Sequence, residues 1–99
     1  MTLTKDSVAV VTGAGSGIGR ALAQRLAAEG IAGLAIADVD RKGIEETAAE
    51  ITGGVKVTTH IVDVANREQM REFADEVVQL HSRVTHVVNN AGVALGGTL

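Results

Sequence analysis

The chain has 99 residues, about the size of one small domain, with 45% hydrophobic and 21% charged residues. This composition is typical of a folded globular chain and argues against disorder. The net charge is −3 without any basic cluster, so neither nucleic acid nor an anionic membrane is expected as a partner. No apolar stretch approaches the ~20 residues of a membrane span, and we expect a cytoplasmic protein. Three poorly spaced histidines and no cysteine predict no metal site.

The first predicted element is a strand over the apolar run of residues 8–11. Unbroken apolar runs are typical of parallel strands, which are buried on both faces. A glycine-rich segment then leads into a predicted helix over residues 17–29, which Gly30 is placed to end. Apolar side chains recur every four positions along this helix, at Ile18, Leu22 and Leu26.

A second strand is predicted over residues 34–37, directly before Asp38. Asp40 is suited to cap a second helix, which we expect to end at Gly53 and Gly54. One face of this helix carries four side chains at helical spacing, namely Ile44, Thr47, Ala48 and Ile51.

Residues 55–62 are rich in Val, Ile and Thr and predict a third strand. Asn66 with Gln69 three positions later resembles a capping box at the start of a third helix. The apolar stripe of that helix consists of Met70, Phe73, Ala74 and Val77. A fourth strand is predicted over residues 84–88. The alternation of strands and helices predicts one α/β domain over residues 1–99, with a parallel sheet covered on both faces and right-handed crossovers.

The segment from Thr12 to Gly19 joins the first strand to the first helix. The pyrophosphate of a dinucleotide needs backbone N–H donors at a helix amino terminus, and side chains there would block its approach. The spacing is TGxxxGxG, with Gly13, Gly17 and Gly19 in the key positions. No lysine follows as in a P-loop, which argues against a nucleoside triphosphate. The alternative is a glycine-rich turn without a ligand.

Asp38 follows Gly19 by 19 residues, close to the ~20 expected of the acid that binds the adenosine ribose. A carboxylate there repels a 2′-phosphate and so favours NAD over NADP. Arg41 lies nearby and could meet a 2′-phosphate, so NADP stays as the less favoured cofactor. The alternative for Asp38 is a solvent-facing residue of a turn.

Two further motifs stand at strand ends: Asp63 and Val64 after the third strand, and Asn89-Asn90-Ala91-Gly92 after the fourth. Together with TGAGSGIG they resemble the short-chain dehydrogenase/reductase family over nearly the whole chain. The resemblance implies a partial Rossmann-like, doubly wound parallel sheet with strand order 3-2-1-4 and three helices. The domain would then be an incomplete NAD-binding domain.

The resemblance also implies roles for individual residues. Ser16, Ile18 and the three key glycines would contact the pyrophosphate. Asp63 would bind the adenine amino group with the Val64 backbone at the ring edge, and Asn90 would lie against the adenosine ribose. The pair of Asn89 and Asn90 would also tie the fourth strand to the turn near Thr12, so Asn89 could have a structural role or a ligand contact. The alternatives are a helix-capping role for Asp63 and a simple turn for the asparagines.

Catalysis in the family that this chain resembles is hydride transfer to or from an alcohol or carbonyl compound, assisted by a serine and a Tyr-x-x-x-Lys pair. The chain has no tyrosine, and Ser7, Ser16 and Ser82 are not in the expected position. We therefore predict no catalytic residue here, and expect the chain alone to be inactive and complete relatives to be homo-oligomers. A free-standing, non-catalytic nucleotide-binding module is an alternative. A methyltransferase is another, and the TGxxxGxG spacing and the Asn-Asn-Ala-Gly motif argue against it.

Overall fold

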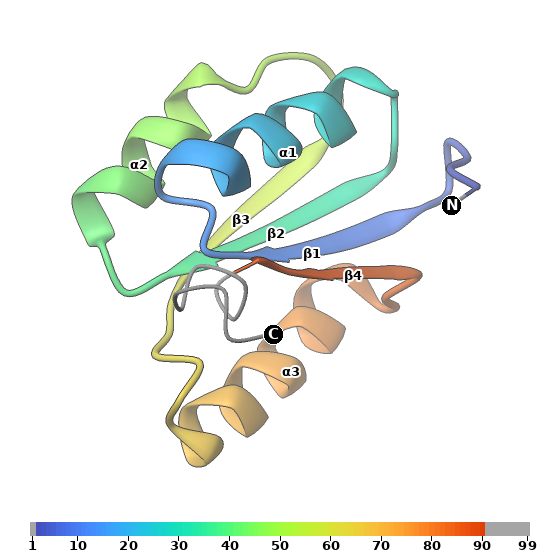
Figure 1. Ribbon diagram of the computed structural model, residues 1–99. Coiled ribbons are helices and arrows are strands. Elements are labelled where there is room, and N and C mark those ends of the chain that lie inside the picture. Colours follow the sequence, from blue (N-terminus) through green and yellow to red (C-terminus); the bar gives the residue numbers. More distant parts are fainter. Residues whose placement is uncertain (1, 91–99) are drawn as a thin grey trace.

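The computed structural model describes residues 2–90, which form one parallel sheet and three helices (Figure 1). In chain order the elements are β1 (Val8–Thr12), α1 (Gly17–Ala28), β2 (Gly33–Asp38), α2 (Arg41–Glu50), β3 (Lys56–Ile61), α3 (Arg67–His81) and β4 (His86–Asn89). The strand order is β3-β2-β1-β4, and every neighbouring pair is parallel. The predicted fold class and strand order are therefore confirmed. Ala91 and Gly92 of the last motif lie outside the described residues.

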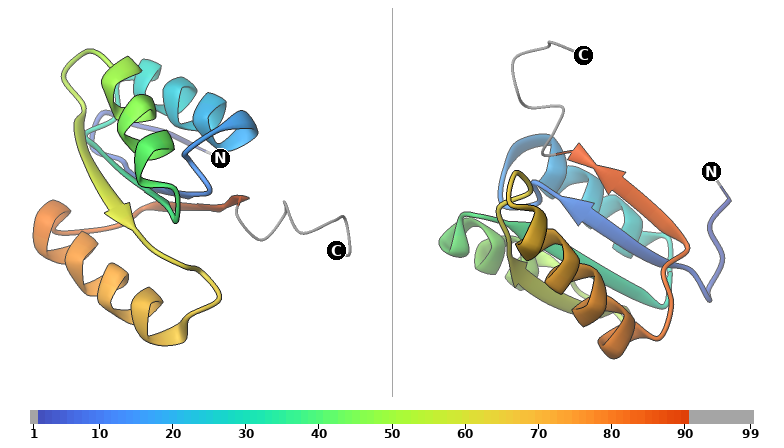
Figure 2. Two further views of the ribbon diagram at one scale, coloured as in Figure 1. Left: turned by 90° about the vertical axis from the view of Figure 1, so that its left-hand side faces the viewer. Right: turned by 90° about the horizontal axis from the view of Figure 1, so that it is seen from below.

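Helices α1 and α2 cover one face of the sheet, and α3 covers the other (Figures 1 and 2). Strand side chains alternate between these two layers because successive residues of a strand point to opposite faces. Val11 and Ile36 pack in the core below α1 and α2, whereas Val10 and Ala37 pack in the core with Phe73 of α3. The unbroken apolar runs of β1 and β2 are thus explained by burial on both faces.

The predicted caps of α2 and α3 are present, but the capping box is not closed as expected. The Asp40 carboxylate accepts the Gly43 N–H at 3.1 Å, and the Asn66 side chain accepts the Gln69 N–H at 3.0 Å. The Asn66 N–H is already bound to the Asp63 carbonyl at 2.9 Å. The Gln69 side chain instead accepts the Asp63 N–H at 2.8 Å, which ties the start of α3 to the end of the preceding strand.

Several element boundaries differ by a few residues from those predicted. Helix α1 ends at Ala28, and α2 ends at Glu50 because Ile51 is already extended. Strand β4 begins at His86 rather than at residue 84. Here the Thr85 hydroxyl accepts the Val8 N–H at 2.8 Å, so a side chain takes the place of a carbonyl of the ladder.

The apolar stripes predicted for α1 and α3 each contain an exposed member. In α1 the buried apolar residues are Ala23 and Leu26, whereas Ile18 at the start of the helix is 70% exposed. In α3 Phe73 and Val77 are buried, whereas Ala74 is exposed beside β4. Of these two exposed residues, only Ile18 lies at the edge of the sheet that carries the glycine-rich turn.

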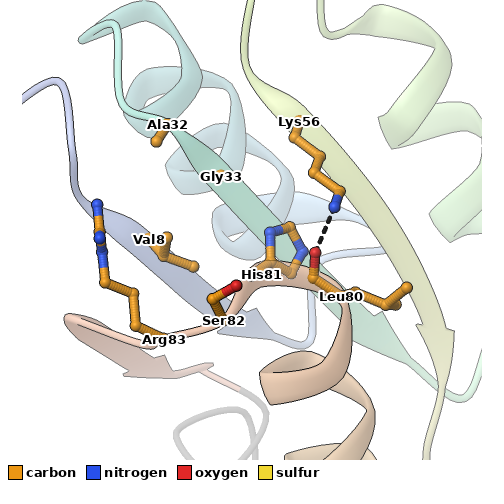
Figure 3. Close-up of a pocket in the computed structure, with 8 residues that line it drawn as sticks. All are labelled: Val8, Ala32, Gly33, Lys56, Leu80, His81, Ser82 and Arg83. Atoms are coloured by element: carbon orange, nitrogen blue, oxygen red, sulfur yellow. Dashed lines mark hydrogen bonds between the residues drawn. The ribbon is translucent and has the colours of Figure 1, made fainter.

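A pocket of about 280 Å³ opens at the opposite edge, between the amino ends of the strands and the end of α3 (Figure 3). It is lined in part by Gly33, His81 and Lys56, whose ammonium group donates to the Leu80 carbonyl. Ligands of open α/β sheets bind beyond the carboxyl ends of the strands. This pocket is therefore at the wrong edge for a cofactor.

His81 belongs to a hydrogen-bonded cluster between α3 and β3. The Thr58 hydroxyl lies 2.8 Å from Nε2 of both His60 and His81, and His60 Nδ1 lies 2.6 Å from the Glu76 carboxylate. A proton arrangement with both imidazoles neutral satisfies every contact: His60 Nδ1–H donates to Glu76, Thr58 donates to His60, and His81 Nε2–H donates to Thr58. Burial first, and then the electrostatic effects of Lys56 and His60, lower the pKa of His81.

We expect the free energy of unfolding to fall as the pH drops below about 6.5, the ordinary pKa of histidine. Because the folded state lowers the pKa of His81, the unfolded chain binds more protons in this range, and stability present above pH 6.5 is lost on acidification. Urea unfolding between pH 7.5 and 5 measures this dependence. The variant His81→Gln should show a weaker one, whereas His86→Gln should keep it. An unchanged slope in His81→Gln would contradict the assignment.

Candidate functional site

The predicted site residues gather beyond the carboxyl ends of the four strands. The glycine-rich turn follows β1, Asp38 ends β2, Asp63 comes after β3 and Asn90 follows β4. Because parallel strands end at one edge of a sheet, these segments lie together (Figure 1). This edge is where ligands of open α/β sheets bind.

The glycine-rich turn leads directly into the amino terminus of α1. Gly13 and Gly17 have φ values of 68° and 57°, the left-handed region that side chains disfavour. Ser16 is the N-cap, and its side chain makes no capping hydrogen bond, while the first turn of α1 contains no acidic residue. Ser16, Gly17 and Ile18 are all exposed. The positive end of the helix dipole is thus accessible, and the first turn of the helix carries no acid of its own, which suits an anionic group.

Asp38 lies against this turn. Its Oδ2 accepts the Gly15 N–H at 2.8 Å, and its Oδ1 accepts the Asp40 N–H at 3.0 Å. The side chain is half-buried. A β-carbon at Gly15 would lie 2.8 Å from Asp38 Oδ2, so only glycine allows this approach. Asp38 is therefore a fixed carboxylate at the turn and not a free surface acid.

Asp63 and Val64 are placed next to Asp38 by the pairing of β2 with β3. The Val62 N–H donates to the Asp38 carbonyl at 3.0 Å. The exposed Asp63 carboxylate accepts the Ala65 N–H at 2.9 Å, so it organises the turn before α3. The N-cap of α3 is Asn66, so Asp63 does not have the alternative role of capping that helix, and a ligand role for Asp63 stays a proposal.

Both asparagines hold the end of β4 against the glycine-rich turn. The Thr12 hydroxyl donates to Asn89 Oδ1 at 3.0 Å, as expected of a residue that ties β4 to the turn. The Asn90 side-chain amide donates to the Gly13 carbonyl at 3.3 Å. Asn90 therefore shares with Asn89 the role of tying β4 to the turn, and its role at the ribose stays a proposal.

The sequence alone did not identify Arg20 or Thr47 as site residues, yet both bind the backbone of the glycine-rich turn. Arg20 Nη2 donates to the Gly15 carbonyl at 2.6 Å, and the Thr47 hydroxyl donates to the Ala14 carbonyl at 2.7 Å. Thr47 was assigned to the core stripe of α2, and it is indeed fully buried. The signal that could have identified it is its hydroxyl, because a buried hydroxyl requires a hydrogen-bond partner.

The exposed amino terminus of α1 and the Asp38 carboxylate beside the turn are chemically suited to a ligand that carries an anionic group and hydroxyl donors. No helix among residues 2–90 is long and apolar enough to cross a membrane. Within the same residues, no three potential metal ligands of the His, Cys, Asp and Glu types come together.

Comparison with known proteins agrees with this geometry. Residues 7–99 match the short chain dehydrogenase family. Over 100 residues the chain is 45% identical to the protein SadH of Mycobacterium tuberculosis, covering 100% of this chain and 36% of SadH. An NAD-bound short-chain dehydrogenase/reductase of Burkholderia phymatum is 35% identical with a TM-score of 0.79, covering 88% of this chain and 31% of that one. NAD⁺-bound xylitol dehydrogenase is 32% identical with the same TM-score, 0.79, covering 85% and 33%. The chain thus spans about a third of the length of these proteins.

Proposed function

Because this chain belongs to the short-chain dehydrogenase/reductase family, we propose that it is the NAD(H)-binding part of an oxidoreductase. That oxidoreductase transfers hydride between nicotinamide and an alcohol or carbonyl substrate. The single observation that carries the choice of NAD is the position of Asp38, whose carboxylate is held by the Gly15 N–H at the turn. The NAD-bound relatives support a nicotinamide dinucleotide as the cofactor.

In this proposal the pyrophosphate lies over the amino terminus of α1, with N–H donors from Ser16, Gly17 and Ile18. The glycines Gly13 and Gly19 keep the turn compact beneath it. Asp38 accepts hydrogen bonds from the adenosine ribose hydroxyls. When bound, the nicotinamide supplies the hydride chemistry, and this chain's own residues hold and orient the dinucleotide.

The adenine would lie further along the same edge. Asp63 would accept a hydrogen bond from the adenine amino group, with the Val64 backbone at the ring edge. Asn90 would lie beside the adenosine ribose while its amide holds the Gly13 carbonyl. The cytoplasm as the location and homo-oligomerisation of the complete protein remain expectations.

Titration of the complete protein with NADH and NADPH tests the proposal. We expect NADH to bind at least about tenfold more tightly, since the Asp38 carboxylate would repel the 2′-phosphate of NADPH at close range. Because the 99 residues contain neither tyrosine nor tryptophan, nicotinamide fluorescence or calorimetry is the suitable readout. Tighter binding of NADPH would contradict the role of Asp38.

The alternative is a free-standing nucleotide-binding module without catalysis, and the absence of tyrosine from the chain fits both functions. An assay of NADH formation by the complete protein, with NAD⁺ and a panel of alcohols as substrates, distinguishes the two functions. Formation of NADH would support the oxidoreductase. Dinucleotide binding without turnover by any substrate would favour the module. The 99 residues alone should form no NADH in either case, and stable folding of the isolated chain would favour the module.

A further inference from the structure

Arg20 connects the glycine-rich turn to helix α2. Its Nη2 donates to the carbonyls of Gly15 at 2.6 Å and Gly43 at 3.1 Å, and its Nε donates to the Thr47 hydroxyl at 2.8 Å. The same guanidinium is paired with two glutamates of α2, Glu46 at 3.3 Å and Glu50 at 3.7 Å. The arginine side chain is 24% exposed, whereas both glutamate side chains are about half exposed.

The ion pairs alone do not explain this placement. Pairs of partly exposed charges contribute little to stability because water screens them and two long side chains must be ordered. The hydrogen bonds to carbonyl oxygens and to the buried Thr47 hydroxyl are different, since they bind a charged donor to groups that are largely removed from water. The main contacts of Arg20 are thus with backbone carbonyl groups, and the two glutamates orient its guanidinium.

One continuous chain of hydrogen bonds leads from Arg20 to Asp38. Arg20 Nε–H donates to the Thr47 hydroxyl, which donates at 2.7 Å to the Ala14 carbonyl. That carbonyl belongs to the same peptide group as the Gly15 N–H, which donates at 2.8 Å to Asp38 Oδ2. Consecutive hydrogen bonds of this kind polarise and strengthen one another. The peptide group between residues 14 and 15 is therefore fixed from both sides.

Arg20 also fixes the next peptide group, because its Nη2 binds the Gly15 carbonyl. With the carbonyls of Ala14 and Gly15 bound to Thr47 and Arg20, the turn cannot rotate these peptide groups without losing both bonds. Helix α2 approaches closely enough for this because Gly43 has no side chain: a β-carbon there would lie 2.6 Å from the Gly15 carbonyl oxygen.

We propose that Arg20 is a positioning residue for the dinucleotide, which sets affinity and the choice between NAD and NADP by holding the Ala14–Gly15 segment against Asp38. This inference rests on the proposed function, because Asp38 is there the residue that distinguishes the two cofactors. Arg20 itself need not touch the dinucleotide. Its effect reaches the ribose through Thr47, the peptide group and the Asp38 carboxylate.

The test compares Arg20→Met and Arg20→Lys with Arg25→Met in the complete protein. Arg25 is the matched control, because it lies on the same helix and its side chain is 80% exposed in an ion pair with Glu29. In Arg20→Met we expect NADH to bind about tenfold more weakly, the size expected when hydrogen bonds to a charged group are lost. NADPH binding should change less, so the preference for NADH shrinks. Arg20→Lys, which can reach one carbonyl, should be intermediate, and Arg25→Met should match the wild type.

A second readout needs no cofactor. The Gly15 amide should be protected from hydrogen exchange in the wild type by its bond to Asp38, and this protection should fall in Arg20→Met but not in Arg25→Met. The pair Thr47→Val and Thr47→Ser tests the hydrogen bond from residue 47 to the Ala14 carbonyl, because only serine keeps the hydroxyl. Thr47→Val should lose Gly15 protection, and Thr47→Ser should retain it.

Equal loss of NADH and NADPH affinity in a folded Arg20→Met protein would overturn the proposal, since it would show a structural role without an effect on Asp38. Unchanged Gly15 protection in both Arg20→Met and Thr47→Val would overturn it as well. Failure of the wild type to bind either dinucleotide would instead overturn the proposed function, and the Gly15 amide would still decide whether Arg20 holds the peptide group.

Discussion

Replacing Gly19 with alanine should abolish NAD(H) binding and destabilise the protein. A β-carbon at this position would lie 1.9 Å from the Gly13 carbonyl oxygen and 2.8 Å from Asn90 Nδ2. These distances are far below van der Waals contact, and the atoms that would have to move are the turn itself and the asparagine that holds it. Displacing a positioned site by about 1 Å costs on the order of 100-fold in function, and overpacking costs roughly 1–3 kcal/mol in stability.

Calorimetric titration with NADH and thermal unfolding of the complete protein measure these two effects. Gly54→Ala is the matched control, because no atom lies within 4 Å of its β-carbon position. It should leave both the affinity and the unfolding temperature near those of the wild type. A folded Gly19→Ala protein with wild-type affinity would sink the assignment of the turn to the pyrophosphate.

Replacing Asp38 with alanine should weaken NADH binding by at least about tenfold, as expected for hydrogen bonds to a charged acceptor, and remove most of the preference for NADH over NADPH. The carboxylate would no longer accept from the ribose hydroxyls or repel a 2′-phosphate. It would also release the N–H groups of Gly15 and Asp40 that it now binds. Dissociation constants for both dinucleotides, measured at one ionic strength, give the change in preference.

One further variant separates the effect of the Asp38 charge from the effect of its hydrogen bonds, and a second variant is a control. Asp38→Asn keeps an oxygen that can accept the Gly15 N–H but has no charge, so it should relax the discrimination against NADPH while keeping the turn in place. Asp75→Ala removes an exposed carboxylate from α3, on the opposite face of the sheet, and should change neither affinity. If Asp38→Ala retained the wild-type preference, Asp38 would not select the cofactor.

Local signals in the sequence were sufficient to predict the alternation of strands and helices because they agree with one another, whereas the strand order was implied by the resemblance to the short-chain dehydrogenase/reductase family. The apolar runs of β1 and β2, the caps Asp40 and Asn66 and the glycine after α1 all act within a few residues. Spacing also placed the turn, Asp38, Asp63 and Asn90 at strand ends, and parallel pairing brings those ends together. Boundaries were less accurate where a side chain replaces the backbone as a partner, as Thr85 does for Val8.

The supporting contacts of the site could not be predicted from local patterns. Arg20 and Thr47 lie on different helices, and which carbonyls they bind depends on how α2 packs against the turn. Ile18 fitted the apolar spacing of α1, yet it is exposed because the first turn of that helix projects beyond the core. Periodicity describes the face of a helix and does not state where along the helix the core ends.

The position of β4 in the sheet has a consequence for the order in which the protein becomes functional. Strand β1 lies between β2 and β4, and the bonds from Thr12 to Asn89 and from Asn90 to Gly13 each join residues 77 positions apart. Contacts between residues so far apart in the chain form after local ones, because the intervening segment must first be closed. Asp38, Thr47 and Arg20 thus hold the turn once β2 and α2 have packed, whereas its bonds to β4 form only after Asn90 has left the ribosome. We therefore expect growing chains to bind the dinucleotide only after β4 has joined the sheet.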